Sequence, residues 1–330
     1  MCAMVPSKAC TARQIRLRRR LTRDYELVMQ RRYEASGFAE SVPAFPRLRR
    51  VMRSLETQFL SHYFGETPRW RKHLRRLAPT RTLPDFCVIG PPKSATSDLA
   101  VTLLMHPNVV LPLAKEFPYV NPEQWRPFYP TEGQKRRHAA RNGGALSPYL
   151  HPSLHSMEVP YSLSQVKPGA RIVIVLRDPI KRLYSHWKWE LLLAGKARAA
   201  KFPFLGRFDT YVDKSLERFG AGIMYSPSNA EGLMHSIYGA SVQTWMECFG
   251  RDNVRVLDVR DYFANQTQFM ERIYDFVGLP QVTEPKFSNR TNENPLALPP
   301  ADARTVDRLR MFFAPHNEFL WNVIGEKFDW

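Results

Sequence analysis

The segment 172–176, Ile-Val-Ile-Val-Leu, constrains the fold most, because five successive aliphatic residues leave no polar face to turn toward water. A strand buried on both faces is typical of a parallel sheet with helices on either side. Asp178 and Pro179 follow the segment, and an aspartate N-cap with a proline in the first turn marks the start of a helix. The segment therefore predicts a central parallel strand that leads directly into a helix.

Shorter apolar runs at 85–89, 109–111 and 254–259 predict three further strands. Helical periodicity between and after them predicts helices over 96–105, 236–249, 266–277 and 301–324. Strands that alternate with helices indicate an α/β fold with a P-loop-like, doubly wound, mostly parallel sheet flanked by helices. Residues 281–300 are expected to form a loop, and 195–230, rich in Lys, Arg, Gly and Ser, a variable loop over an acceptor site.

Residues 1–83 carry most of the net positive charge. They hold 19 of the 48 Lys+Arg and 6 of the 31 Asp+Glu residues, a net charge of +13, against +4 for residues 84–330. Helical periodicity over 11–35 and 47–64 predicts a basic helical arm over 1–83, ahead of an α/β domain over 84–330. Such an arm could contact an anionic membrane, a nucleic acid or a polyanionic glycan, or be only a solvated basic surface. No recognition motif accompanies the charge, so we expect no specific nucleic-acid partner.

The loop after the first predicted strand has the composition of an anion site. It reads Gly-Pro-Pro-Lys-Ser-Ala-Thr-Ser over 90–97 and precedes a predicted helix, where backbone N–H groups and the helix dipole attract phosphate. A nucleoside-triphosphate P-loop would place a glycine just before the lysine, whereas Pro92 precedes Lys93 here. A P-loop nucleotide kinase is therefore an alternative with weak support. It would also need an acid at a strand end for Mg²⁺, and Asp258 is the only such residue.

The segment 176–187 follows the central strand and contains a second group of phosphate-binding residue types. Arg177 ends the strand, and Ser185 lies about two helical turns further on. Both can face the crevice at the carboxyl ends of the strands, where open α/β sheets bind ligands. A guanidinium suits phosphate because it donates two hydrogen bonds at once. Arg182 is expected to be structural or a charge on the helix face.

Taken together, these two segments resemble the sulfotransferases that use 3′-phosphoadenosine 5′-phosphosulfate (PAPS). The first resembles that family's loop Pro-Lys-Ser/Ala-Gly-Thr-Thr, which implies that Lys93 contacts the bridging oxygen of the donor. It also implies that Ser94, Thr96, Ser97 and the loop amides, including that of Ala95, hold the 5′-phosphate. Ala95 stands where the family has glycine, so its backbone must adopt a conformation that a Cβ tolerates. Ser97 replaces a threonine and keeps the hydroxyl.

The second segment resembles the family's 3′-phosphate motif, Arg-Asp-Pro-x-x-Arg-x-x-Ser. The resemblance implies that Arg177 and Ser185 hold the 3′-phosphate of PAPS, and that binding needs no metal. Two further segments of this chain, 146–150 and 309–320, are similar to segments of the carbohydrate enzymes of the heparan and chondroitin type. The match therefore spans about residues 85–330. The paired cysteines and the Lys-Gly-Arg loop seen near the end of the heparan 3-O- and N-sulfotransferases are missing here, and Arg290 could replace that loop's contact to the donor or be a plain loop arginine.

A hydroxyl acceptor must lose its proton, so a base is expected near the sulfur. Lys115 and Glu116 resemble the Lys-Glu pair of the carbohydrate enzymes, in which the glutamate is the base. This implies that Glu116 is the base and that Lys115 assists it beside the sulfate or the acceptor. His106 and His186 are rival bases because histidine titrates near neutral pH, although His106 precedes Pro107 and is more typical of a structural or exposed residue.

The expected reaction is therefore transfer of a sulfuryl group from PAPS to a carbohydrate hydroxyl, with a small hydroxylated metabolite or lipid as the alternative acceptor. Three tryptophans could stack on sugar rings or lie in the core: Trp125, Trp187 and Trp189. No apolar run approaches the ~20 residues that span a bilayer, so the chain as given is expected to be soluble. It would be cytoplasmic if complete, or from the Golgi lumen if it is part of a membrane-anchored enzyme.

Overall fold

The computed structural model describes residues 69–77, 81–110, 112–116, 121–223, 230–282 and 298–330. The expected helices at 11–35 and 47–64 lie outside the described residues, and so does Arg290. In the described part of the chain, no helix is both long and apolar enough to cross a membrane.

Four parallel strands form the sheet: β1 (Phe86–Ile89), β2 (Pro148–His151), β3 (Arg171–Leu176) and β4 (Val254–Asp258). Their order is β2-β1-β3-β4, so β1 and β3 are neighbours and the loops that follow them leave the same edge of the sheet. The predicted parallel sheet is confirmed, with β3 at the expected residues. The predicted strand 109–111 is wrong: Val109 forms only an isolated bridge to Leu146, and Pro148–His151 takes the place beside β1.

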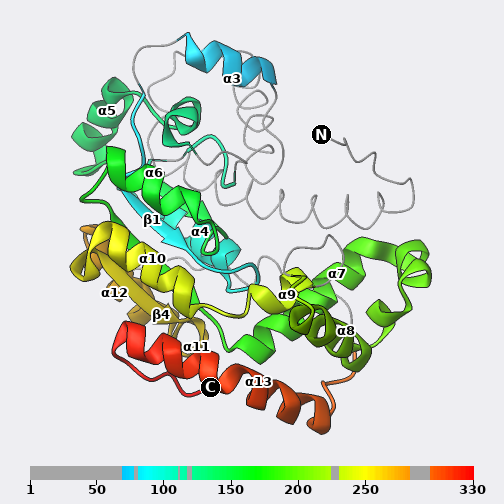
Figure 1. The fold of residues 1–330 in the computed structure, drawn as a ribbon. Coiled ribbons are helices and arrows are strands. Elements are labelled where there is room, and N and C mark those ends of the chain that lie inside the picture. Colours follow the sequence, from blue (N-terminus) through cyan, green and yellow to red (C-terminus); the bar gives the residue numbers. More distant parts are fainter. Residues whose placement is uncertain (1–68, 78–80, 111, 117–120, 224–229, 283–297) are drawn as a thin grey trace.

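Helices cover both faces of the sheet, as a doubly wound fold requires (Figure 1). On one face α4 (Thr96–Leu104), α11 (Val259–Ala264) and α12 (Gln266–Val277) pack on side chains such as Val88 and Val175. On the other face α6 (Glu158–Val166), α10 (Gly239–Phe249) and the end of α13 (Ala303–Ile324) pack on Ile89 and Ile174. Alternate residues of one strand thus enter different cores, which explains why the strands lack a polar face.

Further helices extend one side of the sheet into a separate layer. They are α7 (Pro179–Lys201), the 3₁₀ turn η2 (Pro203–Gly206), α8 (Phe208–Gly220) and α9 (Ala230–Met234). The prediction of a variable loop over 195–230 is therefore wrong for most of this stretch. The reason is packing, because Phe208, Tyr211 and Val212 bury one face of α8 in a core shared with α7 and α13.

The segment before β1 packs onto the sheet domain through backbone contacts. Helix α3 (Arg69–Arg76) lies on the 3₁₀ helix η1 (Pro122–Phe128), and Arg75 donates to the carbonyls of Pro127 at 2.5 Å and Tyr129 at 2.8 Å. Arg81, which is 8% exposed, donates to the same Tyr129 carbonyl at 2.9 Å.

Two further elements complete the described fold. The helix α5 (Glu132–Asn142) follows η1 and starts with a capping box at Thr131. A short 3₁₀ turn, η3 (Arg251–Asn253), precedes β4.

Candidate active site

The loop that follows β1 is pressed against the tip of β3. A Cβ added to Gly90 would lie 2.5 Å from the carbonyl oxygen of Val175, so only glycine fits where the loop leaves the strand. This close approach places the residues after Gly90 beside the start of α7. The two segments that the sequence singled out are thereby joined, although more than 80 residues separate them along the chain.

Two arginines fix successive carbonyl groups of this loop. Arg182, fully buried, donates from Nη1 to the Pro92 oxygen at 3.1 Å, and Arg177 donates from Nη1 to the Lys93 oxygen at 2.9 Å. Arg182 also donates to Ser236 Oγ at 2.8 Å and to the carbonyl of Gly232. Arg182 is thus structural, one of the two roles expected for it, because it ties the loop to α7 and to the end of α9.

The backbone of the loop turns through the left-handed region twice. Lys93 has a φ of 80° and Ala95 a φ of 57°. Ala95 is the N-cap of the nine-residue helix α4 and provides no side-chain cap, and the first N–H groups of any helix have no acceptor within the helix itself. Free N–H groups at a helix start attract an anion. Ala95 stands where the family that the loop resembles has glycine, and its backbone holds a left-handed conformation that glycine adopts without strain.

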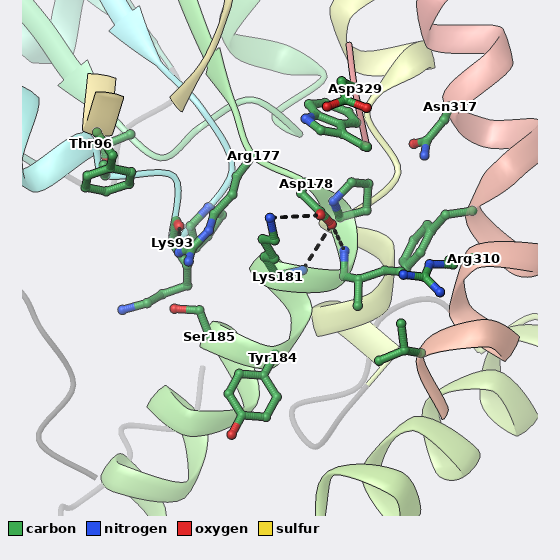
Figure 2. Close-up of a pocket in the computed structure, with 18 of the residues that line it drawn as sticks. Lys93, Thr96, Arg177, Asp178, Lys181, Tyr184, Ser185, Arg310, Asn317 and Asp329 are labelled. Carbon is green, nitrogen blue, oxygen red and sulfur yellow. Dashed lines mark hydrogen bonds and ion pairs between the residues drawn. The ribbon is translucent and has the colours of Figure 1, made fainter. Parts of the chain in front are cut away.

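A single cavity of about 1900 Å³ contains most of the expected site residues. Lys93, Ala95, Thr96 and Ser97 of the loop line it together with Arg177 and Ser185, and Glu116 lines it as well. Figure 2 shows Lys93 and Arg177 at the tips of the strands and Ser185 on α7, with α13 on the opposite side. Ligand pockets are usually about 300–1,000 Å³, so this cavity has room for a nucleotide and a second molecule.

The side chain of Asp178 caps the first turn of α7. Its Oδ1 accepts from the backbone N–H of Ile180 at 2.8 Å and of Lys181 at 3.2 Å, and its Oδ2 lies 3.8 Å from Lys181 Nζ (Figure 2). The predicted N-cap is confirmed. The cap fixes the first turn of α7, and Ser185 follows at a fixed place along that helix.

Positive charge accumulates around Lys93. Burial and, to a smaller extent, the charges of Arg177, Arg182 and Lys115 together lower the pKa of Lys93 to about 8, while Asp98 opposes them. Mutual repulsion of this kind costs free energy until an anion enters. The loop end of the cavity therefore has the electrostatics of a site for a multiply charged anion.

Lys115 and Glu116 form an ion pair at the same end of the cavity. Lys115 is 2% exposed, whereas 48% of the Glu116 side chain is exposed to the cavity and to solvent. Burial raises the pKa of Glu116, but the charge and the hydrogen bond of Lys115 outweigh it, so that the pKa lies below its usual value. Glu116 is thus ionised at neutral pH and can accept a proton.

The other candidates for binding and catalysis lie away from the cavity surface. Ser94 is fully buried and does not line the cavity, and its Oγ has no hydrogen-bond partner among the described residues. His106 is held on both ring nitrogens, by the Pro280 carbonyl at 2.8 Å and the Asn108 N–H at 3.1 Å, which makes it structural. His186 is buried against Glu190 and does not line the cavity.

The acid that a nucleotide kinase would need is engaged elsewhere. Asp258 is 2% exposed, caps α11, and accepts from Arg260 Nε at 2.9 Å and from Trp330 Nε1 at 2.8 Å. In the described part of the chain, no cluster of three His, Cys, Asp or Glu side chains could hold a metal ion.

The structure shows which of the three tryptophans lie in the core and which lines the cavity. Trp125 and Trp187 are buried in the core, whereas Trp189 lines the cavity.

The sequence-based predictions missed the contribution of α13, which lines the cavity with Arg310, Ala314, Asn317 and Trp321. Their spacing of four, three and four residues marks one helix face and was the signal available.

Comparisons with known proteins agree with this geometry. A family model described as a sulfotransferase domain matches residues 83–298. The bifunctional heparan sulfate N-deacetylase/N-sulfotransferase 4 of Mus musculus is 25% identical over 217 residues, which cover 60% of this chain and 22% of that protein. Carbohydrate sulfotransferase 15 of Mus musculus is 23% identical over 341 residues, which cover 85% of this chain and 58% of that protein. This chain thus spans less than two thirds of the length of either relative.

A solved structure is similar over most of the fold. It is the crystal structure of a sulfotransferase from Alicyclobacillus acidocaldarius, with a TM-score of 0.53 and 21% sequence identity over 75% of this chain and 98% of that chain. The similarity supports the α/β architecture described above.

Proposed function

Because this chain belongs to the sulfotransferase family, whose domain model covers residues 83–298, we propose that it transfers the sulfuryl group of PAPS to a hydroxyl of a carbohydrate. The observation that carries the proposal is the shared cavity, in which the loop at Lys93 meets Arg177 and Ser185. A donor with anionic groups at two places can be held at both places at once. The names of the two mouse relatives, which refer to heparan sulfate and to carbohydrate, favour a sugar acceptor.

The chemistry of the loop fits such a donor. Like charges converge on Lys93, and the N-cap residue of α4 provides no side-chain cap. Lys93, the N–H groups from Ala95 onward, and the hydroxyls of Thr96 and Ser97, which line the cavity, would hold the 5′-phosphosulfate. The buried Ser94 hydroxyl does not line the cavity, so the contact first expected for it is not part of the proposal. Arg177 and Ser185 would hold the 3′-phosphate. Arg290 remains a candidate for a further contact to the donor and lies outside the described residues.

The residues can supply both kinds of assistance that the transfer needs. When bound, PAPS supplies an activated sulfuryl group, and the sulfur bonds to the acceptor oxygen as its bond to the bridging phosphate oxygen breaks. Glu116 accepts the proton that the acceptor hydroxyl loses. Lys93 faces the negative charge that grows on the bridging oxygen, and the fixed dipoles of the loop act in the same direction. Lys115 keeps Glu116 ionised and oriented.

The identity of the acceptor is tested by a transfer assay with radiolabelled PAPS against a panel of glycans and small alcohols. We expect labelled sulfate to appear on a glycan. Transfer only to a small hydroxylated metabolite or lipid would replace the carbohydrate by that alternative, and the absence of transfer to every acceptor would contradict the proposal.

Two substitutions test the roles of the site residues. Lys93→Ala should abolish turnover while the protein still folds, because the leaving oxygen loses its cation. Glu116→Gln should lower kcat by at least about 100-fold with nearly unchanged affinity for adenosine 3′,5′-bisphosphate, because general base catalysis is typically worth that factor. The matched control is Glu123→Gln, since Glu123 pairs with Arg126 outside the cavity. A loss confined to nucleotide binding in Glu116→Gln would remove the assignment of the base.

A further inference from the structure

The indole ring of Trp189 lies against the ammonium group of Lys93. The Lys93 Nζ is 4.2 Å from the centroid of the ring, well inside the range of about 6 Å for a cation–π contact. Trp189 follows Ser185 by four residues on α7, so both side chains lie on one helix face. Lys93, Ser185 and Trp189 line the same cavity. The contact therefore joins the loop after β1 to the helix after β3, at the end of the cavity that contains Lys93.

No carboxylate competes for Lys93 among the described ion pairs. The cations that act on Lys93 come from three places, namely Arg177 at the end of β3, Arg182 on α7, and Lys115, whereas Asp98 on α4 is the opposing charge. His186 and Glu190 on α7 pair with each other at 3.1 Å. The ring of Trp189 is thus the described group that contacts the ammonium directly and attracts it.

We propose that Trp189 is a positioning residue for Lys93, which holds the charged ammonium at the reacting end of the cavity through the face of its ring. The ring suits this role better than a carboxylate would, because it has no net charge: it attracts the cation without neutralising it and repels an anionic donor far less. The attraction is on the order of a few times thermal energy, weaker than an ion pair in a buried site, so the ammonium can move onto a developing oxyanion. The inference rests on the proposed function of Lys93 and adds the group that prepares it for that function.

The contact can be measured in the protein without donor, by NMR titration of Lys93 in protein with isotopically labelled lysine, assigned with Lys93→Arg. Trp189→Leu keeps an apolar side chain and removes the ring. We expect the half-titration point of Lys93 to move to lower pH by about one unit, because the charged form loses its attraction. Trp189→Phe keeps a ring and should remain close to the unmodified protein.

A second lysine–tryptophan pair provides the matched control. Lys327 Nζ lies 5.0 Å from the centroid of Trp321, which also lines the cavity but belongs to α13. Trp321→Leu removes a ring from the same cavity and should leave the titration of Lys93 unchanged. If Trp189→Leu leaves the half-titration point where it was, or moves it upward, the positioning role is refuted.

Kinetics then separate positioning from binding. We expect Trp189→Leu to lower kcat about tenfold and to leave the Kd of adenosine 3′,5′-bisphosphate within about threefold, with most of the rate restored in Trp189→Phe. Retained nucleotide binding also shows that the variant folds. An effect on KM alone would overturn the inference. Should the unmodified protein transfer no sulfuryl group while the Lys93 titration still shifts, the proposed function fails and the Trp189–Lys93 contact stands.

Discussion

Replacing Ala95 by glycine tests the strain at the start of α4. Ala95 has a φ of 57° and a ψ of 16°, and this left-handed conformation costs a residue with a Cβ roughly 1–2 kcal/mol. Against this, glycine loses about 0.4–1 kcal/mol more on folding because its unfolded chain is freer. The Ala95 methyl is only partly buried beside the core that contains α4, so little apolar burial is lost. We expect Ala95→Gly to raise the free energy of unfolding by about 0.5–1 kcal/mol.

Equilibrium denaturation in urea, followed by circular dichroism, measures this difference. The control is Ala140→Gly, which removes the same methyl from an exposed position of α5 and should lower the free energy of unfolding by about 1 kcal/mol. The two substitutions are thus expected to have opposite signs. If Ala95→Gly destabilises the protein as Ala140→Gly does, the loop does not hold a strained alanine and the reasoning from φ fails.

Three further predictions follow from the surroundings of single residues. If Lys93 acts as proposed, turnover should decline as the pH rises through about 8, because burial and neighbouring cations lower the pKa of Lys93 to about 8 and a neutral amine would not stabilise the leaving oxygen; a pH–rate profile that stays flat to about pH 10 would contradict this. Burial lowers the pKa of His151 and of His155 to about 4. As the pH falls, these histidines therefore take up protons in the unfolded chain before they do so in the folded protein. The stability that depends on their neutral forms is complete above about pH 6.5 and is lost toward pH 4, at up to about 1.4 kcal/mol per pH unit for each. Urea midpoints that do not fall between pH 6.5 and pH 4 would contradict this prediction. Ser236→Ala leaves the buried Arg182 Nε without its 2.8 Å acceptor and should cost about 1.5–3 kcal/mol of stability in the same denaturation assay, whereas an unchanged midpoint would show that Arg182 finds another partner.

The errors of the sequence-based predictions have identifiable physical causes. Pro148 argues against a strand because it cannot donate to a ladder, yet it stands first in a strand at the edge of the sheet, where this is tolerated. The apolar run at 109–111 looked more suitable and makes only a bridge. In 195–230 the abundance of Lys, Arg and Gly concealed Phe208, Tyr211, Val212 and Ser215, which are buried at the spacing of an amphipathic helix.

Local sequence patterns were enough to predict the alternation of buried strands and helices, the start of α7 at Asp178, and the residue types of the two segments proposed to bind the donor. These features depend on neighbouring residues, so local patterns are sufficient to predict them. Only the folded chain shows that Arg177 and Arg182 donate hydrogen bonds to the carbonyls of Lys93 and Pro92, across 84 and 90 residues of sequence. It also shows that Trp189, rather than Trp125 or Trp187, faces the cavity. Such contacts depend on how the sheet brings two loop ends together, and no periodicity within either segment encodes that distance.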